Sequence, residues 1–333
     1  MNTKKNYQPN IVVIGGGTGS FTLLSGLKRY TGNITALVNM ADDGGNTGEL
    51  RDDLGVLPPG DVRQCLVALS DTARARDLFN YRFDEGRLQG SSFGNLFLSA
   101  VEKMTNSFEE AIELASEVLR ITGRVIPLTL DDAKLVAKTK GGLEVHGQHK
   151  LCTIRLDTLK PDLSFEKPVH IHDPARQAIE HADIVVISPG NLNGSLGPAM
   201  IVEGVGEALE KTKAKVVCVA NLVTKPGQTD SFTVQDHVSE LERFAGVEMI
   251  DYVIYNTDEP TKHMREKYVR DGEYMLEFDL DALEHAPYRA IGLPLIDKSI
   301  ITYDKNDKIA HVRSLIRHNS DRVAREVMKI YFS

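Results

Sequence analysis

The sequence predicts an α/β protein built on a doubly wound, mostly parallel sheet, and two observations lead to this prediction. Short runs rich in β-branched residues alternate along the chain with stretches of helical periodicity. The runs are apolar at nearly every position, which is typical of strands that helices cover on both faces. They are IVVI (11–14), ITALV (34–38), DIVVIS (183–188), KVVCVA (215–220) and DYVIY (251–255).

Helices are expected between these strands. From Val62 to Leu69, apolar residues recur at i, i+3, i+4 and i+7, which gives one stripe for burial against the sheet. Asp61 followed by Gln64 resembles a capping box at the start of this helix. Four further helices are expected, over residues 94–104, 107–120, 197–210 and 320–331.

Residues 124–170 interrupt this alternation. Within them, AKLVAKTKGGLEVHGQ (133–148) alternates at period two on either side of Gly141 and Gly142, which predicts a hairpin with a two-residue turn. We interpret 124–170 as a small antiparallel β insertion on the doubly wound core. No internal repeat, low-complexity tract or Pro/Ser-rich linker divides the chain, so residues 1–333 are predicted to form a single compact unit.

Composition argues against several classes of partner. The net charge is −8 and no basic run is present, which argues against nucleic acid as a partner. No stretch approaches the roughly 18 apolar residues that a membrane span needs. The three cysteines show no Cys-x-x-Cys spacing, and no secretory signal is visible. Reduced thiols and a cytoplasmic location are therefore expected.

A glycine-rich turn follows the first predicted strand. The pattern only approximates G-x-G-x-x-G, and it has no lysine of the Walker type. Backbone N–H groups at the start of the next helix would cradle a phosphate or diphosphate. The alternative is a tight strand-to-helix turn that serves close packing. The candidate ligand contacts in this turn are Gly15, Gly16, Gly17, Thr18, Gly19 and Ser20.

Two adjacent carboxylates, Asp42 and Asp43, follow the second predicted strand. Dinucleotide-binding folds place an acidic residue on the ribose hydroxyls at about this point of the chain. Gly44 and Gly45 let the backbone turn sharply, so one carboxylate can face the ligand crevice while the other caps backbone N–H groups. Alternatively, both are solvated turn residues.

A third loop, SPGNLNGSLGPAM (188–200), follows a later strand and precedes a helix. In a doubly wound sheet such loops flank the ligand crevice, which makes Gly190 and Asn191 candidate ligand contacts. An ordinary connection with turn residues explains the same loop equally well. His170 and His172 share one face of a short strand, but no third metal ligand follows at a suitable spacing, so we expect no metal site there.

The sequence resembles the gluconeogenesis factor family (YvcK-like), within the superfamily that also holds the 2-phospholactate transferases (CofD-like). The resemblance extends from about residue 10 to about residue 330. Eight motifs carry it, in the expected order: VVIGGGTGSFTLLSGL, ADDGG followed by LR, LPPGDVRQCLVALSD, SSFGNLFLSA, GRVIPLT, ADIVVISPGNL, NLVTKPGQTDSFTVQDHV and LIRHNSDRVA.

The resemblance implies a Rossmann-like fold and a uridine diphosphate sugar, such as UDP-N-acetylglucosamine or UDP-glucose, as the ligand. It also implies a regulatory role in morphogenesis, cell-wall homeostasis and growth on gluconeogenic carbon sources, without a settled catalytic activity or a certain cofactor. Cell-wall or metabolic proteins are the implied protein partners, and a homo-oligomer is left open. The implied ligand contacts are Thr18, Tyr268 and Arg317, with Asn95 and Asn221 from two of the shared motifs.

The chain also departs from the family's usual motifs. Relatives read D-D-G-G-S-S-G where this chain has Asn46 and Thr47, and G-H-S-x-G-N-L where it has Ser91. In the later loop they read G-P-G-S-L-Y-T-S, against Asn191 and Asn193 here. These departures bear on which sugar is bound.

Two enzymatic alternatives stay open from the sequence. The first is a transferase that resembles the 2-phospholactate enzymes, in which Asp42 or Asp43 would hold Mg²⁺ or orient the attacking hydroxyl. The second is an NAD(P)-dependent oxidoreductase, which rests on the glycine-rich turn alone. The motifs after residue 215 resemble the YvcK-like branch more closely, so we favour a non-catalytic binder of nucleotide sugars.

Overall fold

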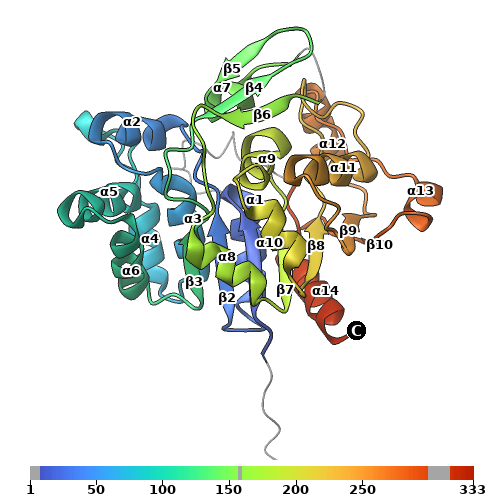
Figure 1. Ribbon diagram of the computed structural model, residues 1–333, viewed down its shortest axis with the longest axis horizontal. Coiled ribbons are helices and arrows are strands. Elements are labelled where there is room, and N and C mark those ends of the chain that lie inside the picture. Colours follow the sequence, from blue (N-terminus) through green and yellow to red (C-terminus); the bar gives the residue numbers. More distant parts are fainter. Residues whose placement is uncertain (1–7, 157–159, 299–315) are drawn as a thin grey trace, which may run out of the picture.

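The computed structural model describes residues 8–156, 160–298 and 316–333, and its centre is a parallel sheet of seven strands (Figure 1). The strand order is β10-β9-β8-β7-β1-β2-β3. All five predicted strands are present, and β3 and β10 join them at the two edges. The strands are β1 (Ile11–Gly15), β2 (Ile34–Val38), β3 (Arg124–Pro127), β7 (Ile184–Ile187), β8 (Lys215–Val219), β9 (Tyr252–Asn256) and β10 (Arg289–Leu293).

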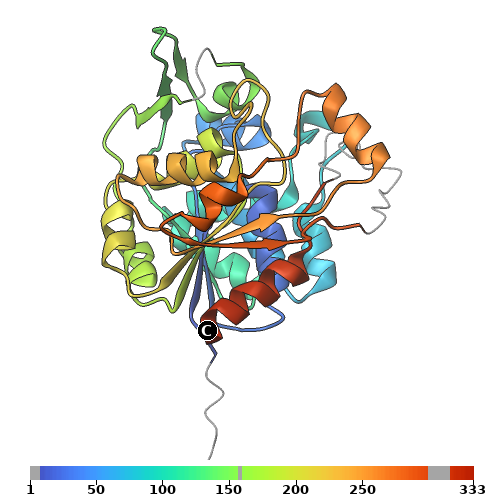
Figure 2. The same cartoon turned by 90° about the vertical axis from the view of Figure 1, so that its right-hand side faces the viewer.

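Helices cover both faces of the sheet, as the continuous apolar strands predict (Figure 2). In β1, Ile11 and Val13 belong to the core on one face, and Val12 and Ile14 belong to the core on the other. The first core is completed by α1 (Gly17–Leu27), α3 (Pro59–Leu69), α5 (Phe93–Thr105), α6 (Phe108–Leu119) and α14 (Ser320–Phe332). The second is completed by α8 (Asp173–Glu180), α9 (Gly197–Met200), α10 (Val205–Lys211) and α11 (Val234–Ala245).

The other helices are α2 (Gly45–Leu54), α4 (Ala73–Asn80), η1 (Gly86–Leu88), α7 (Gln148–Thr153), η2 (Leu192–Leu196), α12 (Lys262–Arg270) and α13 (Leu280–Glu284).

Most predicted helices are confirmed, with two corrections. The helix expected over 197–210 is two helices, α9 and α10, because Gly204 between them has a φ of 95°. The capping box expected at Asp61 is wrong, since α3 begins at Pro59 and places Asp61 inside its first turn. Proline is favoured at the first helical position because its missing N–H would have no partner there, and this sets the earlier start.

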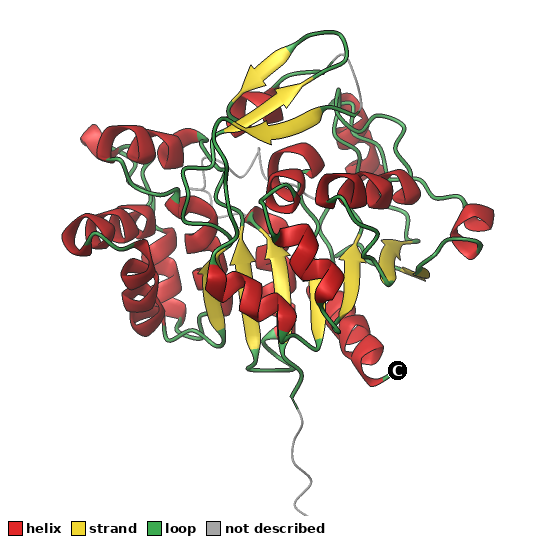
Figure 3. Ribbon diagram, in the orientation of Figure 1, coloured by secondary structure: helices red, strands yellow, loops and turns green. Residues whose placement is uncertain are grey.

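The expected antiparallel insertion is present, but it is shorter than predicted (Figure 3). Its sheet has the order β5-β4-β6, formed by β4 (Leu135–Lys138), β5 (Glu144–His146) and β6 (Asp162–Phe165). Residues 124–127 are instead β3, which pairs in parallel with β2. The hairpin loop has three residues rather than two, because the Thr139 N–H donates to the Leu143 carbonyl.

The insertion leaves and rejoins the core at one narrow neck. There the His172 N–H donates to the carbonyl of Leu128, at 2.9 Å. The small sheet then extends beyond the carboxyl ends of the central strands (Figure 1). In the described part of the chain, no helix combines the length and the apolar character needed to cross a membrane.

The strand order reverses between β1 and β7. From β1 the chain proceeds to β2 and β3 on one side, whereas β7 to β10 extend the sheet on the other side. The helices that follow β1 and β7 therefore pack on opposite faces of the sheet. In doubly wound proteins the carboxyl side of this reversal is where ligands bind.

Candidate functional site

The glycine-rich turn at the end of β1 packs directly against the loop after β7. A Cβ atom at Gly19 would lie 1.7 Å from the carbonyl oxygen of Pro189, so only glycine fits there. The hydroxyls of Ser20 and Ser188 are 2.8 Å apart and fully buried, which ties the same two segments together. Thr18 is exposed on the first turn of α1. The turn thus joins the two halves of the sheet, and its contact with a ligand stays a prediction.

Asp61 is a candidate that sequence analysis used only as a helix cap. Its carboxyl group accepts a hydrogen bond from the N–H of Gly17, the first residue of α1, and a Cβ atom at Gly16 would lie 2.1 Å from Asp61 Oδ2. Burial, reinforced by the charge of Asp42, raises the pKa of Asp61 to about 7. The consecutive prolines before it were the available signal, because they move the helix start and turn Asp61 towards the glycines.

Asp42 is hydrogen-bonded within its own turn. Its Oδ1 accepts from the N–H of Gly44 at 3.0 Å, and its carboxyl also accepts from the side chain of Thr47. Burial raises the pKa of Asp42, and these two hydrogen bonds oppose the shift. Asp42 and Asp61 act on one another electrostatically, so the acidic group beside the glycine-rich turn includes a carboxylate from the loop after β2 and one from α3.

Asp43 points to a different partner. Its Oδ1 accepts from the N–H of His149 at 2.6 Å and its Oδ2 from the N–H of Gln148 at 3.1 Å, both in the first turn of α7. Gly147, just before α7, has a φ of 92° and passes close to the same carboxylate. Asp43 therefore fastens the insertion to the carboxyl end of β2. Asp42 is held within its turn and Asp43 contacts α7, so the expectation that one of them faces a ligand stays a prediction.

Two hydrogen bonds join the loop after β7 to the loop after β8, a contact that we call the Asn221–Gly190 clamp. Asn221 accepts from the Gly190 N–H at 2.9 Å and donates to the Gly190 carbonyl at 2.8 Å. Asn191 caps η2 by accepting from the N–H of Gly194 at 2.9 Å. Asn193 is buried, and neither polar atom of its side chain has a hydrogen-bond partner among the described residues. These candidates do gather at the reversal of strand order.

Two of the residues that differ from the family motifs, Asn46 and Ser91, belong to one polar network with Asn95. The Asn46 side chain donates to the Ser91 hydroxyl at 2.9 Å and accepts from Asn95 at 3.3 Å. Asn95 in turn accepts from the buried guanidinium of Arg63 at 2.9 Å. The second guanidinium contact is to Asn80, at 2.6 Å. Asn95 is thus held in a side-chain network that borders the acidic group.

Tyr268 and Arg317 lie further along the carboxyl edge, by which we mean the side of the sheet where the carboxyl ends of the parallel strands lie. They are near β9 rather than near β1 and β2. Tyr268, 7% exposed, lines a cavity of about 470 Å³ beyond the end of β9, together with Arg265 and Thr257. Its hydroxyl accepts from the N–H of Ile316 at 2.9 Å, directly before the partly exposed Arg317. A second cavity, of about 600 Å³, opens at the amino ends of β1, β2 and β3, on the opposite side of the sheet. None of the predicted site residues lines it.

The segment that carries Arg317 runs from this cavity to the glycine-rich turn. Ile316 lines the cavity, and His318 donates from Nε2 to the Ala220 carbonyl at 3.0 Å. His318 also lies with Gly19 and Pro189 around a small gap beside α1. Three strand spacings separate β9 from β1, or roughly 14 Å. The candidates therefore spread along the carboxyl edge and do not form one compact cluster.

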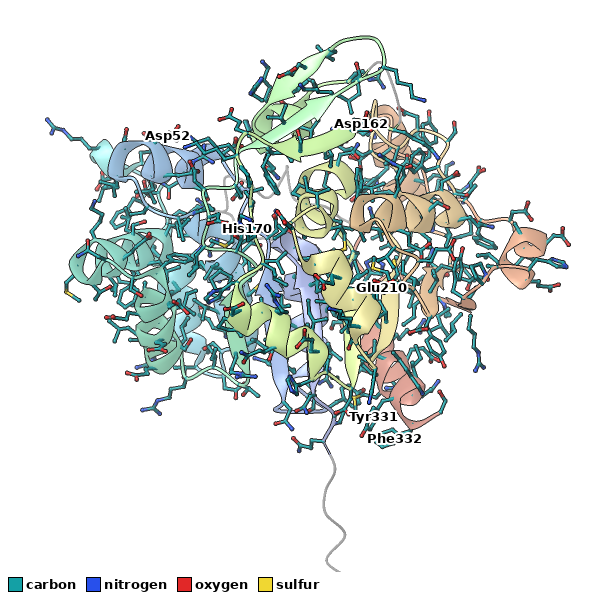
Figure 4. All side chains as sticks on the ribbon, in the orientation of Figure 1. Asp52, Asp162, His170, Glu210, Tyr331 and Phe332 are labelled. Atoms are coloured by element: carbon teal, nitrogen blue, oxygen red, sulfur yellow. The ribbon has the colours of Figure 1, made fainter. Side chains whose placement is uncertain are left out.

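The two histidines singled out in the sequence, His170 and His172, contact different acidic residues. Within the described ranges, no group of three or more His, Cys, Asp or Glu side chains is arranged to hold a metal ion. His170, which Figure 4 labels, contacts Asp131 and Glu203, whereas His172 contacts Glu109. The two histidines have separate partners.

Comparison with known proteins places the chain in a family. Residues 11–296 match the family described as 2-phospho-L-lactate transferase CofD. The chain belongs to the CofD family. It is 37% identical over 322 residues to the gluconeogenesis factor of Bacillus subtilis, a match that covers 95% of this chain and 96% of the relative. The Clostridium acetobutylicum protein with the name "Putative gluconeogenesis factor" is 41% identical over 322 residues. This match covers 95% of this chain and 68% of the relative.

A solved structure supports the same assignment. The crystal structure of a UPF0052-family protein from Bacillus halodurans matches with a TM-score of 0.87 and 31% identity. The match covers 96% of this chain and 100% of that one. The predicted family and the predicted α/β fold are both confirmed.

Proposed function

We propose that this CofD-family protein is a gluconeogenesis factor that binds a nucleotide sugar and regulates without catalysing a reaction. The observation that carries the proposal is the reversal of strand order between β1 and β7, whose carboxyl side gathers the glycine-rich turn, the acidic residues and the Asn221–Gly190 clamp. The names of the Bacillus and Clostridium relatives support the biological role.

The arrangement suggests how a uridine diphosphate sugar would lie. The cavity beside Tyr268 has a volume in the range of ligand pockets, roughly 300–1,000 Å³, and an aromatic wall for a base. We assign the diphosphate to Thr18, which is exposed at the start of α1, and to Arg317, which follows the cavity-lining Ile316. The sugar then lies towards Asp42 and Asp61. UDP-N-acetylglucosamine and UDP-glucose are the ligands to test first.

The proposed biological role follows the family. Binding of the sugar would report the supply of cell-wall precursors and so couple carbon metabolism to cell shape. The protein would work in the cytoplasm through cell-wall or metabolic protein partners, alone or as a homo-oligomer.

The first experiment is a thermal unfolding panel with uridine and guanosine nucleotides, followed by calorimetry. UDP-sugars should raise the melting temperature, because a ligand that binds only the native state stabilises it by mass action. Arg317→Ala should weaken UDP-N-acetylglucosamine about tenfold to a hundredfold, the worth of one charge-assisted hydrogen bond. Arg87→Ala is the control, because Arg87 is exposed on η1 and lines neither cavity. Stabilisation by guanosine nucleotides alone would contradict the proposal.

The transferase alternative is favoured by the CofD match itself. Such an enzyme would use Mg²⁺, which takes one or two carboxylates together with water and phosphate oxygens. Asp43 accepts one backbone N–H on each oxygen, which leaves each oxygen a second lone pair for a cation. Asp42 is likewise engaged by Gly44 and Thr47. Calorimetry with Mg²⁺ and with EDTA decides, since a regulatory binder should bind its sugar equally in both. The NAD(P) alternative gains nothing from the relatives.

A further inference from the structure

We propose that the second cavity, at the amino ends of β1, β2 and β3, binds a small organic anion that also carries hydroxyl groups, such as a sugar phosphate or a hydroxy acid. The cavity has a volume of about 600 Å³, within the roughly 300–1,000 Å³ of ligand pockets. It lies on the side of the sheet away from the proposed nucleotide-sugar site, and that function does not use it. The inference is therefore independent of the proposed function.

The floor of the cavity is a row of three residues that crosses the amino ends of the strands. The parallel register places Val12, Thr35 and Arg124 side by side on β1, β2 and β3. Val12 belongs to the core on the face that α8 covers, and residues in register point to the same face. Thr35 is 6% exposed, and its hydroxyl accepts from the Arg124 guanidinium at 3.5 Å, a long hydrogen bond that a better acceptor can replace. The row thus ends in a cation on β3, at the edge of the sheet.

The roof of the cavity is one stripe of α8 and the residue that follows it. The stripe lines the cavity at i, i+3, i+4 and i+7, with Pro174, Gln177, Ala178 and His181. A helix that packs on a sheet normally presents apolar residues in such a stripe, but here two of the four are polar and Ala178 is small. His181 Nδ1 donates to the Gln177 carbonyl at 2.8 Å, which leaves Nε2 to contact a ligand. Polar groups therefore border the space from above as well as from below.

The wall of the cavity carries a positive charge. Arg124 belongs to it, and no Asp or Glu is among the described residues that line it. Two nearby acids are engaged elsewhere, since Asp173 pairs with Arg176 at 3.6 Å and Asp183 accepts from the Asn10 N–H at 2.8 Å. A guanidinium can hold the carboxylate or phosphate of a ligand through two parallel hydrogen bonds. The anionic group is accordingly assigned to Arg124.

The remaining polar groups of the cavity suit hydroxyls. Asn10, Asn33 and Gln177 all line it, and an amide side chain offers both donors and an acceptor. The Asn33 amide nitrogen donates to the Gln8 carbonyl at 3.2 Å, so its oxygen and its second N–H are left for a ligand. A hydroxylated body with one anionic group matches the amides and the arginine together. Sugar phosphates and hydroxy acids share this chemistry.

The test begins with calorimetry of the wild type and three probes, glucose 6-phosphate, gluconate and glucose. At least one of the two anions should bind with a Kd of about 1 mM or lower, and glucose should bind at least about tenfold more weakly. Binding of one anion alone identifies the anionic group as a phosphate or a carboxylate. Binding of neither anion would overturn the inference, and so would glucose that binds as tightly as the anions.

Two variants then locate the bound anion. Arg124→Ala should weaken it about tenfold to a hundredfold, because charge-assisted hydrogen bonds are lost. Arg124 is exposed, so this variant should fold, and Arg74→Ala is the matched control at an exposed position on α4 that lines neither cavity. Ala178→Leu should weaken the anion as well, because it fills the cavity and keeps the arginine. Unchanged affinity in a folded Arg124→Ala protein would overturn the inference.

Arg317→Ala separates this site from the proposed nucleotide-sugar site. The five residues of β1 lie between the cavity and the glycine-rich turn, a length of roughly 16 Å. Arg317→Ala should therefore leave the affinity for the anion unchanged. Binding that is lost in Arg317→Ala and kept in Arg124→Ala would place the anion at the carboxyl edge and overturn the inference. Failure of UDP-sugars to bind would contradict the proposed function alone.

Discussion

The carboxyl edge is closely packed near β2 and has a cavity near β9. At the β2 end, Asp42, Asp43 and Asp61 each accept a hydrogen bond from a backbone N–H of another residue, and Gly16 and Gly19 lie too close to neighbouring atoms to carry a Cβ atom. At the β9 end, Tyr268 borders a cavity of about 470 Å³. The richest sequence motif therefore marks the most tightly packed part of the edge. The open volume lies where the sequence carries the weakest motif, around Tyr268.

The sharpest test of this contrast is Gly19→Ala at the packed end. The new Cβ atom would meet the Pro189 carbonyl at 1.7 Å, and a backbone atom has little freedom to move away. The free energy of unfolding should fall by about 3 kcal/mol or more, measured by urea denaturation. Gly32→Ala is the control, because the atoms nearest to its added Cβ lie 3.8 Å away. A fully stable Gly19→Ala protein would show that the two halves of the sheet are not tightly joined here.

Asp43→Ala should have the next largest effect. It leaves two N–H groups of α7 without their charged acceptor, so the free energy of unfolding should fall by about 2 kcal/mol. Amide hydrogen exchange should accelerate at α7 and the neighbouring hairpin more than at β1. Asp43→Asn should recover part of the loss, because its carbonyl can still accept one N–H. Unchanged exchange at α7 would mean that other contacts hold the insertion.

A pH titration of stability tests His318, which lies in the segment between the Tyr268 cavity and the glycine-rich turn. Burial lowers the pKa of His318 to about 4, below the roughly 6.5 of an unfolded chain. Between these values the unfolded state binds a proton that the folded state does not, so stability is lost as the pH falls from about 6.5 to 4. His318→Gln should remove about 2 kcal/mol of this loss at pH 5, because pH 5 lies roughly 1.5 units below the unfolded pKa and each unit is worth about 1.4 kcal/mol. His237, whose pKa burial also lowers to about 4, keeps the rest.

The control for the titration is His263→Gln, at an exposed position on α12. It should leave the pH dependence unchanged. If wild type and His318→Gln lose the same free energy between pH 7.5 and pH 5, then His318 is not held neutral in the folded protein.

The sequence was informative where one local pattern decides the structure. Continuous apolar runs predicted five strands and their helical covering, because a strand buried on both faces has no polar positions. β10, with the sequence RAIGL, was not predicted, because its apolar run is short and the strand is half-exposed at the edge of the sheet. The break at Gly204 also escaped, because helical periodicity persists across a single glycine.

The site was harder to predict, because its contacts join distant segments. Asp42 and Asp43 were recognised as candidates from their place after a strand. The partner of Asp61 is Gly17, and that of Asp43 is His149, and no local pattern reveals such pairs. The family resemblance implied that Tyr268 and Arg317 contact one ligand, which stays a prediction. The structure adds that the Tyr268 hydroxyl holds the amide just before Arg317.

The narrow neck at Leu128 and His172 makes the insertion an exchangeable module. One backbone hydrogen bond closes the neck, so the ends of any grafted segment would start from the same two points. The entropic cost of closing a segment grows only slowly with its length, about 0.6 kcal/mol for each doubling. A substitute would also have to replace the contacts that the insertion makes with the core, such as the hydrogen bond from Gln228 to the Leu151 carbonyl and that from the Leu156 N–H to the Gly227 carbonyl. The length of an exchanged segment therefore matters less to stability than whether these contacts are kept.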